Sequence, residues 1–135
     1  MIDKSDTVAA LKRMLKGGKL TNIPRRKSDR DLLLALAAAQ FARESAYSES
    51  DVNVLLDGWL KSFCSPRHVD YVTVRRYLID LGYLRRDAGG RIYKLYPARL
   101  DGEITPEAAR VEPRKILTEL ELERGMRKHI HQSGT

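Results

Sequence analysis

Residues 70–96 constrain the fold of this chain more than any other segment, because a short helix runs there directly into a hairpin centred on glycine. Asp70 is a favourable N-cap residue and Gly82 suits the position just past a helix end, so the sequence predicts a helix over 71–81. The glycines of the turn can adopt the backbone conformations that a tight hairpin requires. The two arms of this hairpin are Tyr83–Asp87 and Arg91–Tyr96, joined by Ala88-Gly89-Gly90.

A strong start signal predicts another helix upstream. Ser48 and Asp51 have the spacing of a capping box, and Tyr47 precedes them, where it can pack against Val52. From Val52 onward, apolar residues recur at helical spacing and form one face. This face consists of Val52, Leu55, Leu56, Trp59, Leu60 and Phe63. We expect Trp59 to lie at its centre.

The most apolar stretch of the chain predicts the central helix of the core. Ser28, with Asp31 three residues later, resembles a capping box and opens a helix over about 29–43. Residues 32–39 are eight successive apolar residues, which are too few to cross a bilayer. A helix that is apolar on nearly all sides is instead typical of a buried core element.

These elements predict a mainly α fold with a small β-hairpin. Three helices followed by a basic hairpin are typical of a winged helix-turn-helix-like core, in which the hairpin is the wing. A short amphipathic helix over Thr7–Lys16 precedes the core, and a charged helix over Arg114–His131 follows it. The expected organisation is an N-terminal helix and basic segment at 1–27, the winged-helix-like core at 28–96, a linker with Pro and Gly at 97–113, and a C-terminal helix and tail at 114–135.

The chain of 135 residues has a formal net charge of +7, and its basic residues are unevenly spread. The excess lies in two blocks, residues 1–31 and 61–96, whereas residues 32–60 are net acidic. Such a surface favours a polyanionic partner or an anionic membrane surface. The single cysteine, Cys64, cannot form an intramolecular disulfide, and no signal-peptide pattern or membrane-spanning run occurs. We therefore expect a cytoplasmic protein of bacterial type, with no membrane partner.

The second basic block supplies the candidate nucleic-acid contacts. At about 100° per residue, the 71–81 helix directs Arg76 and Thr73 away from the face that Val74 and Leu78 bury. An exposed arginine on such a helix can bind guanine bidentately in a major groove, and threonine can reach a phosphate or a thymine methyl. The structural alternatives are an ion pair from Arg76 to Asp80 and contact of Arg75 with a neighbouring helix.

Side-chain alternation in the hairpin predicts two mixed faces. One face carries Tyr83, Arg85, Tyr93 and Leu95, and the other carries Leu84, Arg86, Ile92 and Lys94. The cations either reach over a phosphate backbone or protect an edge strand from pairing. The candidate DNA-binding residues are Thr73, Arg75, Arg76, Arg85, Arg86, Arg91 and Lys94.

Several short motifs between Leu15 and Tyr93 occur together in one bacterial family. They are Gly18-Lys19-Leu20, Ile23-Pro24, Tyr47-Ser48-Glu49, Asp51-Val52-Asn53 with Leu56, Asp70, Arg75-Arg76-Tyr77-Leu78, Asp80, Gly82, Leu84, Arg86 and Gly90–Tyr93. On these residues the chain resembles the domain-of-unknown-function family 2087. It departs from the family pattern at Ser50-Asp51 and in a longer Lys61–Val69 connection.

The resemblance implies a winged-helix-like domain associated with bacterial transcriptional regulators. It leaves open a ligand-sensing or docking role beside a separate DNA-binding domain. Among the matching residues, Asn53 could tie its helix to a neighbouring loop, and Glu49 could pair with Arg75 or Arg76. An arginine held by Glu49 would be structural and unavailable to DNA.

No pattern in the sequence demands enzyme chemistry. A Gly-rich phosphate loop and the His-x-x-x-His and Cys-x-x-Cys patterns are missing. Cys64 and His68 are four residues apart, but Ser65-Pro66 interrupts the helix between them. His129 and His131 would point to different sides of a helix. We expect a protein that is not an enzyme, with no catalytic residues, no cofactor and no metal site.

The C-terminal helix carries apolar residues with no assigned partner: Leu117, Leu120, Leu122, Met126 and Ile130. They pack either on the domain or on a second copy of the chain, and a two-fold dimer would match a palindromic DNA site.

The sequence thus predicts a DNA-binding transcriptional regulator that applies its third helix and basic wing to double-stranded DNA, with a homodimer through the C-terminal helix as a further option. The alternative is a non-enzymatic protein-interaction or ligand-sensing module of a regulatory system. RNA binding is a third option, with Tyr83, Tyr93 and Tyr96 as candidates for base stacking.

Overall fold

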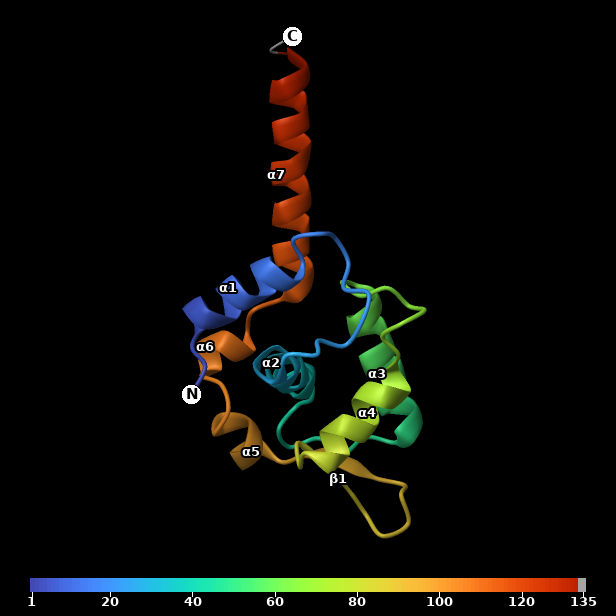
Figure 1. Cartoon of the computed structure of the whole chain (residues 1–135). Coiled ribbons are helices and arrows are strands. Elements are labelled where there is room, and N and C mark those ends of the chain that lie inside the picture. The colour runs from blue at the N-terminus through green and yellow to red at the C-terminus, as the bar shows by residue number, and fades with distance from the viewer. Residues whose placement is uncertain (134–135) are drawn as a thin grey trace.

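The computed structural model describes the backbone of residues 1–133 and the side chains of residues 1–126. Its elements are α1 (Lys4–Met14), α2 (Lys27–Ala38), α3 (Glu49–Lys61), α4 (Tyr71–Asp80), β1 (Leu84–Arg86), β2 (Tyr93–Leu95), α5 (Pro97–Asp101), α6 (Pro106–Ala109) and α7 (Pro113–Ser133). Helix α2 runs through the middle of the molecule (Figure 1). It has α1, α5 and α6 on one side and α3, α4 and the hairpin on the other. The predicted mainly α fold with a small hairpin is confirmed.

Helix α2 is the buried centre of the core, as its apolar run predicts. All its residues from Leu32 to Ala38 are at most 2% exposed. Its start differs from the predicted one at about residue 29. The helix begins at Lys27, and the residue before it, Arg26, makes no side-chain cap. Ser28 therefore does not cap the helix, and the Asp31 carboxylate binds Lys27 at 2.7 Å instead.

Helix α3 starts at the predicted capping box. The Ser48 hydroxyl accepts from the Asp51 N–H at 3.0 Å, and the Asp51 carboxylate accepts from the Ser48 N–H at 3.2 Å. Val52, Leu56, Leu60 and Phe63 are buried. The prediction for Trp59 is wrong: its side chain is half-buried and packs edge-to-face on Phe63 at 4.7 Å between ring centroids. Residues four apart form the centre of the buried stripe, and Trp59 lies about 100° round the helix from Leu60.

Helix α1 begins three residues earlier than predicted. Asp3 is its N-cap and accepts from the Asp6 N–H at 2.8 Å. Thr7, the predicted first residue, lies within the helix, where its buried hydroxyl donates to the Asp3 carbonyl at 2.8 Å. The predicted glycine stop holds, since the helix ends at Met14 and Gly18 follows with a φ of 116°.

Helix α4 has the predicted caps. The Asp70 carboxylate accepts from the Thr73 N–H at 2.8 Å, and Gly82 follows the helix with a φ of 82°. Val74 and Leu78 are fully buried against α2 and α3. The helix thus presents one side to the core and the other to solvent.

The hairpin pairs one residue out of the predicted register. The structure pairs Arg86 with Tyr93, Arg85 with Lys94 and Leu84 with Leu95. A three-residue turn would pair Asp87 with Arg91, but the Asp87 N–H donates to the carbonyl of Ile92 at 3.0 Å. The loop is therefore one residue longer, and a shift of one residue exchanges the faces of a strand. The predicted grouping of Arg85 with Tyr93 and Leu95 is wrong.

A third extended segment joins the hairpin. Tyr47 forms an antiparallel bridge with Tyr93, with backbone N–H to carbonyl distances of 2.9 and 2.8 Å in the two directions. The order is then a helix (α2), a short extended segment, two helices (α3 and α4) and a hairpin, with the short segment beside the second hairpin strand. This arrangement confirms a winged-helix-like core.

The predicted linker at 97–113 is a packed segment. It contains α5 and α6, and Leu100, Ile104 and Ala108 within it are buried. Pro97 and Pro106 start these helices at their first turns, a position where proline is well tolerated. The sequence suggested a linker because these same prolines and Gly102 are typical of turns.

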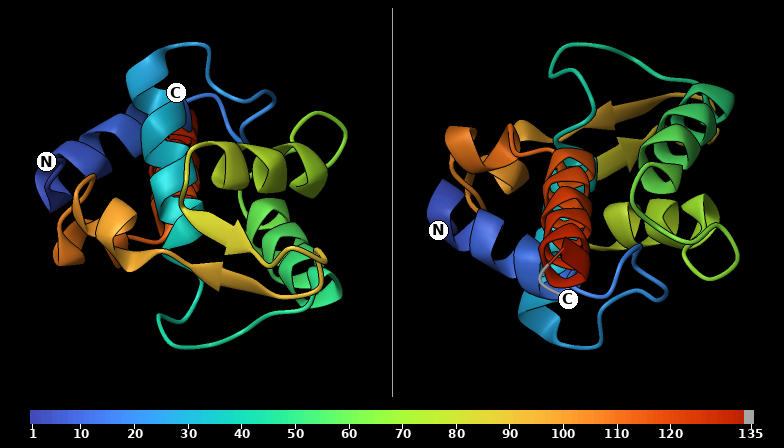
Figure 2. Two further views of the ribbon diagram at one scale, coloured as in Figure 1. Left: turned by 90° about the horizontal axis from the view of Figure 1, so that it is seen from below. Right: turned by 90° about the horizontal axis from the view of Figure 1, so that it is seen from above.

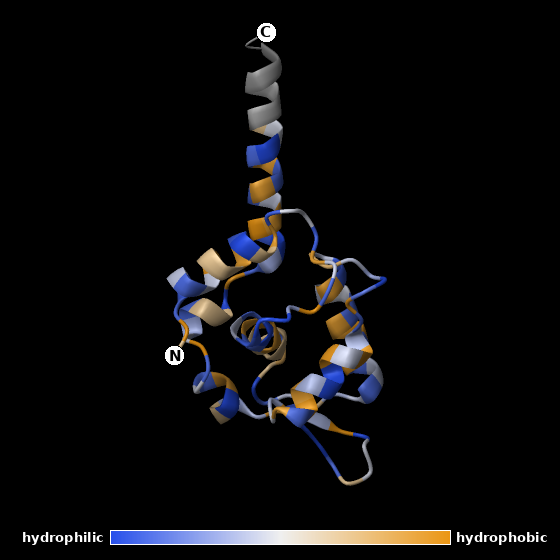
Figure 3. Ribbon diagram, in the orientation of Figure 1, coloured by the Kyte–Doolittle hydropathy of each residue, from blue (hydrophilic) through white to orange (hydrophobic). Residues whose placement is uncertain are grey.

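Helix α7 begins on the core and then projects from it (Figure 1). Ile116 and Leu117 are buried, and the helix packs against α1. Leu122 and Met126 are 63% and 64% exposed on the projecting part, whose turns alternate in hydropathy (Figure 3). The first turns of α7 therefore do have a partner within the chain. The side chains of His129, Ile130 and His131 lie outside the described residues. None of the described helices combines the length and the apolar character needed to cross a membrane.

Candidate nucleic-acid interface

The solvent side of α4 carries Arg76. This residue is exposed, and its side chain makes no ion pair or hydrogen bond with any residue that the structure describes, even though Asp80 lies one turn later on the same side. The alternative of an Arg76–Asp80 ion pair is therefore not realised. Its guanidinium is available to a molecule that approaches α4 from solvent.

The neighbouring Arg75 is held within the fold. Its guanidinium donates to the side-chain oxygen of Asn53 and forms an ion pair with Glu49 at 3.1 Å, both residues of α3. Only 15% of the Arg75 side chain is exposed. The predicted pairing with Glu49 is confirmed for Arg75, and Asn53 ties α3 to α4 rather than to a loop. Arg75 thus fixes the position of α4 while Arg76 faces outward.

Thr73 belongs to the N-terminal cap of α4. Its hydroxyl donates to the Asp70 carboxylate at 3.1 Å, and its side chain is half-buried. The oxygen keeps a lone pair and the methyl group is free, but the hydroxyl proton is already engaged.

Two cations occupy directly opposed backbone positions in the hairpin. Arg85 pairs with Lys94 in the antiparallel register, and both are exposed. Directly opposed residues have Cβ atoms about 4.5–5.5 Å apart, and like charges in such positions are destabilising. The Arg85 guanidinium lies over the Tyr96 ring, 3.5 Å from its centroid, which holds it at this surface. The pair therefore concentrates positive charge, and neither side chain forms an ion pair with a carboxylate in the described part of the chain.

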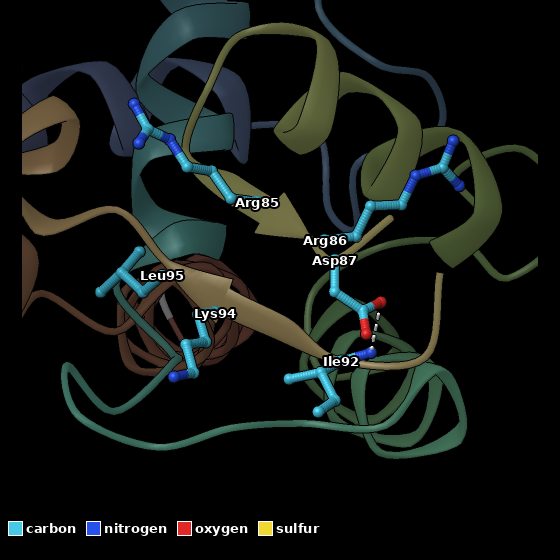
Figure 4. Close-up of a pocket in the computed structure, with 6 residues that line it drawn as sticks. All are labelled: Arg85, Arg86, Asp87, Ile92, Lys94 and Leu95. Carbon is cyan, nitrogen blue, oxygen red and sulfur yellow. Dashed lines mark hydrogen bonds between the residues drawn. The ribbon is translucent and has the colours of Figure 1, made fainter. Parts of the chain in front are cut away.

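Arg86 and Arg91 extend this charge along the wing. Both are exposed and neither side chain has a hydrogen-bond or ion-pair partner among the described residues. Figure 4 shows Arg85, Arg86 and Lys94 pointing outward in different directions around an open hollow of about 450 Å³. Ile92 and Leu95 also line this hollow.

The tip of the wing is ordered by one carboxylate. Asp87 accepts from the N–H of Arg91 at 2.7 Å and from that of Ile92 at 3.2 Å. The N–H groups of Ile92 and Arg91 hold the pKa of Asp87 below its ordinary value. Gly90 completes the turn with a φ of 67°. The charge of Asp87 is directed at the turn backbone, so it leaves the four cations of the wing without a carboxylate partner.

The remaining predicted features lie elsewhere or are buried. Tyr83 and Tyr93 are at most 2% exposed and cannot stack on a base, which leaves Tyr96 beneath Arg85. Cys64 is buried, and burial raises its pKa to about 12, while His68 is exposed. Among the described residues, no group of three or more His, Cys, Asp or Glu could hold a metal ion.

Most of the candidate interface lies within a region that matches a known protein family. The family described as "Uncharacterized protein conserved in bacteria (DUF2087)" matches residues 19–95, more than half of the chain. The chain belongs to this family. The DUF2087 match covers α2, α3, α4 and the hairpin, together with the connection that leads into α2. No curated protein and no solved structure matches the chain.

Exposed arginines of the DUF2087 region outside the predicted site residues include Arg26 and Arg67. Arg26 precedes α2, and Arg67 lies in the loop before α4. The excess of positive charge in residues 1–31 was a signal for the first.

Proposed function

We propose that this protein binds double-stranded DNA and acts as a transcriptional regulator in the bacterial cytoplasm, without enzymatic activity. In this proposal, α4 enters the major groove with Arg76 toward the base edges. The hairpin then lies over the phosphate backbone with Arg85, Arg86, Arg91 and Lys94.

The opposed Arg85 and Lys94 are the observation that carries the proposal. A pair that only blocked edge-to-edge pairing would work with one cation or with mixed charges. Two opposed cations on one face, with Arg86 on the other face (Figure 4) and Arg91 at the turn, instead favour a polyanion that contacts the wing at several points. The resemblance of the DUF2087 region to domains associated with transcriptional regulators supports the same role.

A salt titration with the full chain tests this proposal. Each phosphate neutralised by a cation contributes about 0.9 to the slope of log K against log salt for duplex DNA. The four wing cations should therefore contribute roughly −4 to the slope for a random duplex if each contacts a phosphate. Single strands of the same length should bind less tightly, because they lack the groove that α4 fits. Failure to bind any duplex at low salt would refute the proposal.

The alternative of a protein-interaction or ligand-sensing module is favoured by apolar exposure on the wing. Ile92 is 45% exposed and Tyr96 is 37% exposed, and Ile92 lines the hollow beside Arg86. A protein partner would bury Ile92, so Ile92→Ser would abolish its binding. The same change would leave duplex binding intact if only the cations contact DNA.

A homodimer through α7 stays a proposal for the projecting part of the helix. Leu122 and Met126 are the exposed apolar residues there. In sequence, Glu119, Glu121 and Glu123 precede a basic stretch from Arg124 to Lys128, so two antiparallel helices would oppose unlike charges. Sedimentation of Leu122→Ser/Met126→Ser should show monomers where the natural chain shows dimers. A natural chain that is already monomeric would contradict the proposal.

A further inference from the structure

The connection between α1 and α2 lies along the flank of α4 that faces away from the hairpin. Leu20 in this connection pairs with the loop before α4, and its carbonyl accepts from the Ser65 N–H at 2.8 Å. Further along, the Arg30 guanidinium of α2 lies 5.9 Å from the centroid of the Tyr77 ring of α4. Both views of Figure 2 show α4 between this connection and the hairpin.

Three arginines on this flank are exposed: Arg25, Arg26 and Arg67. Within the described part of the chain, none of their side chains forms an ion pair or a hydrogen bond. Neighbouring cations differ, since Lys27 pairs with Asp31 at 2.7 Å and Lys19 donates to the Lys61 carbonyl at 3.3 Å.

The backbone indicates where Arg26 and Arg67 lie relative to α4. Arg26 is the N-cap residue of α2, so its backbone lies one turn before Arg30, the residue through which α2 contacts Tyr77 of α4. Arg67 is in the loop that enters α4, three residues before its N-cap. The two residues thus belong to one flank of the helix, and the wing cations belong to the other.

We propose that Arg25, Arg26 and Arg67 form a second contact with DNA phosphates, on the groove edge opposite the wing. This inference rests on the proposed function. Helix α4 has ten residues and is about 15 Å long, and the major groove is about 12 Å wide. A helix seated in this groove has a phosphate strand on each side. The wing binds one strand, and the connection before α2, with the loop before α4, binds the other.

The double variant Arg26→Ala/Arg67→Ala tests the second contact. Its matched control is Lys12→Ala/Lys16→Ala, which removes the same charge from exposed positions on α1 and just after it. The flank variant should flatten the salt slope by about two units, because two phosphate contacts are lost. It should also lose ethylation interference at phosphates on one edge of the bound groove. The control variant should keep the natural salt slope and the natural pattern of ethylation interference. Unfolding curves of the two variants should match the natural chain, since none of the four residues is buried.

Three outcomes are decisive. If the flank variant keeps the natural salt slope while Arg91→Ala flattens it, the wing alone contacts phosphates and this inference is overturned. If the control flattens the slope as much as the flank variant, the effect is only net charge, and the inference is again overturned. If the natural chain binds no duplex at low salt, the proposed function itself fails, and this inference fails with it. The first two outcomes overturn only this inference and leave the proposed function standing.

Discussion

The charges that join α1 to α2 and those on the hairpin are arranged in opposite ways. Arg13 of α1 meets Asp29 of α2 in a two-bonded ion pair, with nitrogen to oxygen distances of 2.7 and 2.9 Å. Arg85 and Lys94 of the hairpin are instead directly opposite each other in the strand register, and their side chains point apart (Figure 4). A cation beside a carboxylate stabilises the fold, whereas two cations at directly opposed positions destabilise it. The difference separates charges that hold the fold from charges kept free for an anionic partner.

The same contrast occurs between adjacent residues of α4. Arg75 binds Asn53 and Glu49 of α3, whereas Arg76 binds no carboxylate or amide among the residues that the structure describes. Composition cannot distinguish these two arginines, but their positions about 100° apart on the helix can.

The largest expected effect concerns the core on which both regions rest. Leu56→Ala removes a fully buried side chain from α3 and should lower the free energy of unfolding by about 2–5 kcal/mol in urea titrations. The matched control Val54→Ala, at a position 71% exposed, should change it by no more than about 0.5 kcal/mol. Equal costs would mean that the buried face of α3 is misassigned. Trp59→Ala should fall between them because Trp59 is half-buried.

Exchanging the two arginines of α4 for alanine should separate folding from recognition. Arg76→Ala should leave the melting temperature unchanged and cost about 1–3 kcal/mol of discrimination at one base position. Arg75→Ala should lower the melting temperature, because it leaves the half-buried Asn53 amide without its partner. Binding to a panel of single-base duplex variants, with thermal melts, checks both. An equal loss for Arg76→Ala on every sequence would show that Arg76 reads no base.

The Arg13–Asp29 pair should make the free energy of unfolding depend on pH in the acid range. Its hydrogen bond with Arg13 holds the pKa of Asp29 below the ordinary value, despite the opposing effect of burial. The group therefore stabilises the fold above about pH 4, the unfolded pKa, and that contribution is lost as pH falls through the lower folded pKa. Asp29→Asn should cost about 1 kcal/mol at pH 7 and much less near pH 2 in urea titrations. A cost that stays constant over this range would contradict the role of the pair.

The smallest expected effect belongs to the tip of the wing. Arg91→Ala should flatten the salt slope of duplex binding by about one unit on every DNA sequence, because Arg91 is predicted to contact one phosphate. Lys115→Ala is a suitable control, since Lys115 is already paired with Glu112 at 3.2 Å. A change in sequence preference with an unchanged slope would place Arg91 on a base instead.

Local signals in the sequence predicted much of the fold. Ser48 and Asp51 predicted the start of α3, Asp70 and Gly82 predicted both ends of α4, and the apolar run predicted the central position of α2. Each of these signals acts within one or two turns of chain.

The errors arose where distant or competing groups decide. The register of the hairpin follows from the Asp87 carboxylate, which holds two backbone N–H groups and lengthens the loop by one residue. The sequence left open which arginine Glu49 holds, and the choice of Arg75 follows from Asn53 and Glu49, which lie more than 20 residues earlier in the chain. The short helices α5 and α6 begin at prolines that are equally compatible with a turn.

Replacing Lys94 by glutamate tests the central claim most directly, because stability and binding should move in opposite directions. In Lys94→Glu, Arg85 faces a carboxylate across the hairpin, so the repulsion becomes an attraction and the melting temperature should rise. The same change places a negative charge against the proposed phosphate contact, so duplex affinity at low salt should fall at least tenfold, because a repulsive contact replaces an attractive one. A variant that is more stable and binds duplex poorly is the predicted result. A variant that binds duplex as well as the natural chain would contradict the claim that the opposed cations are kept for DNA.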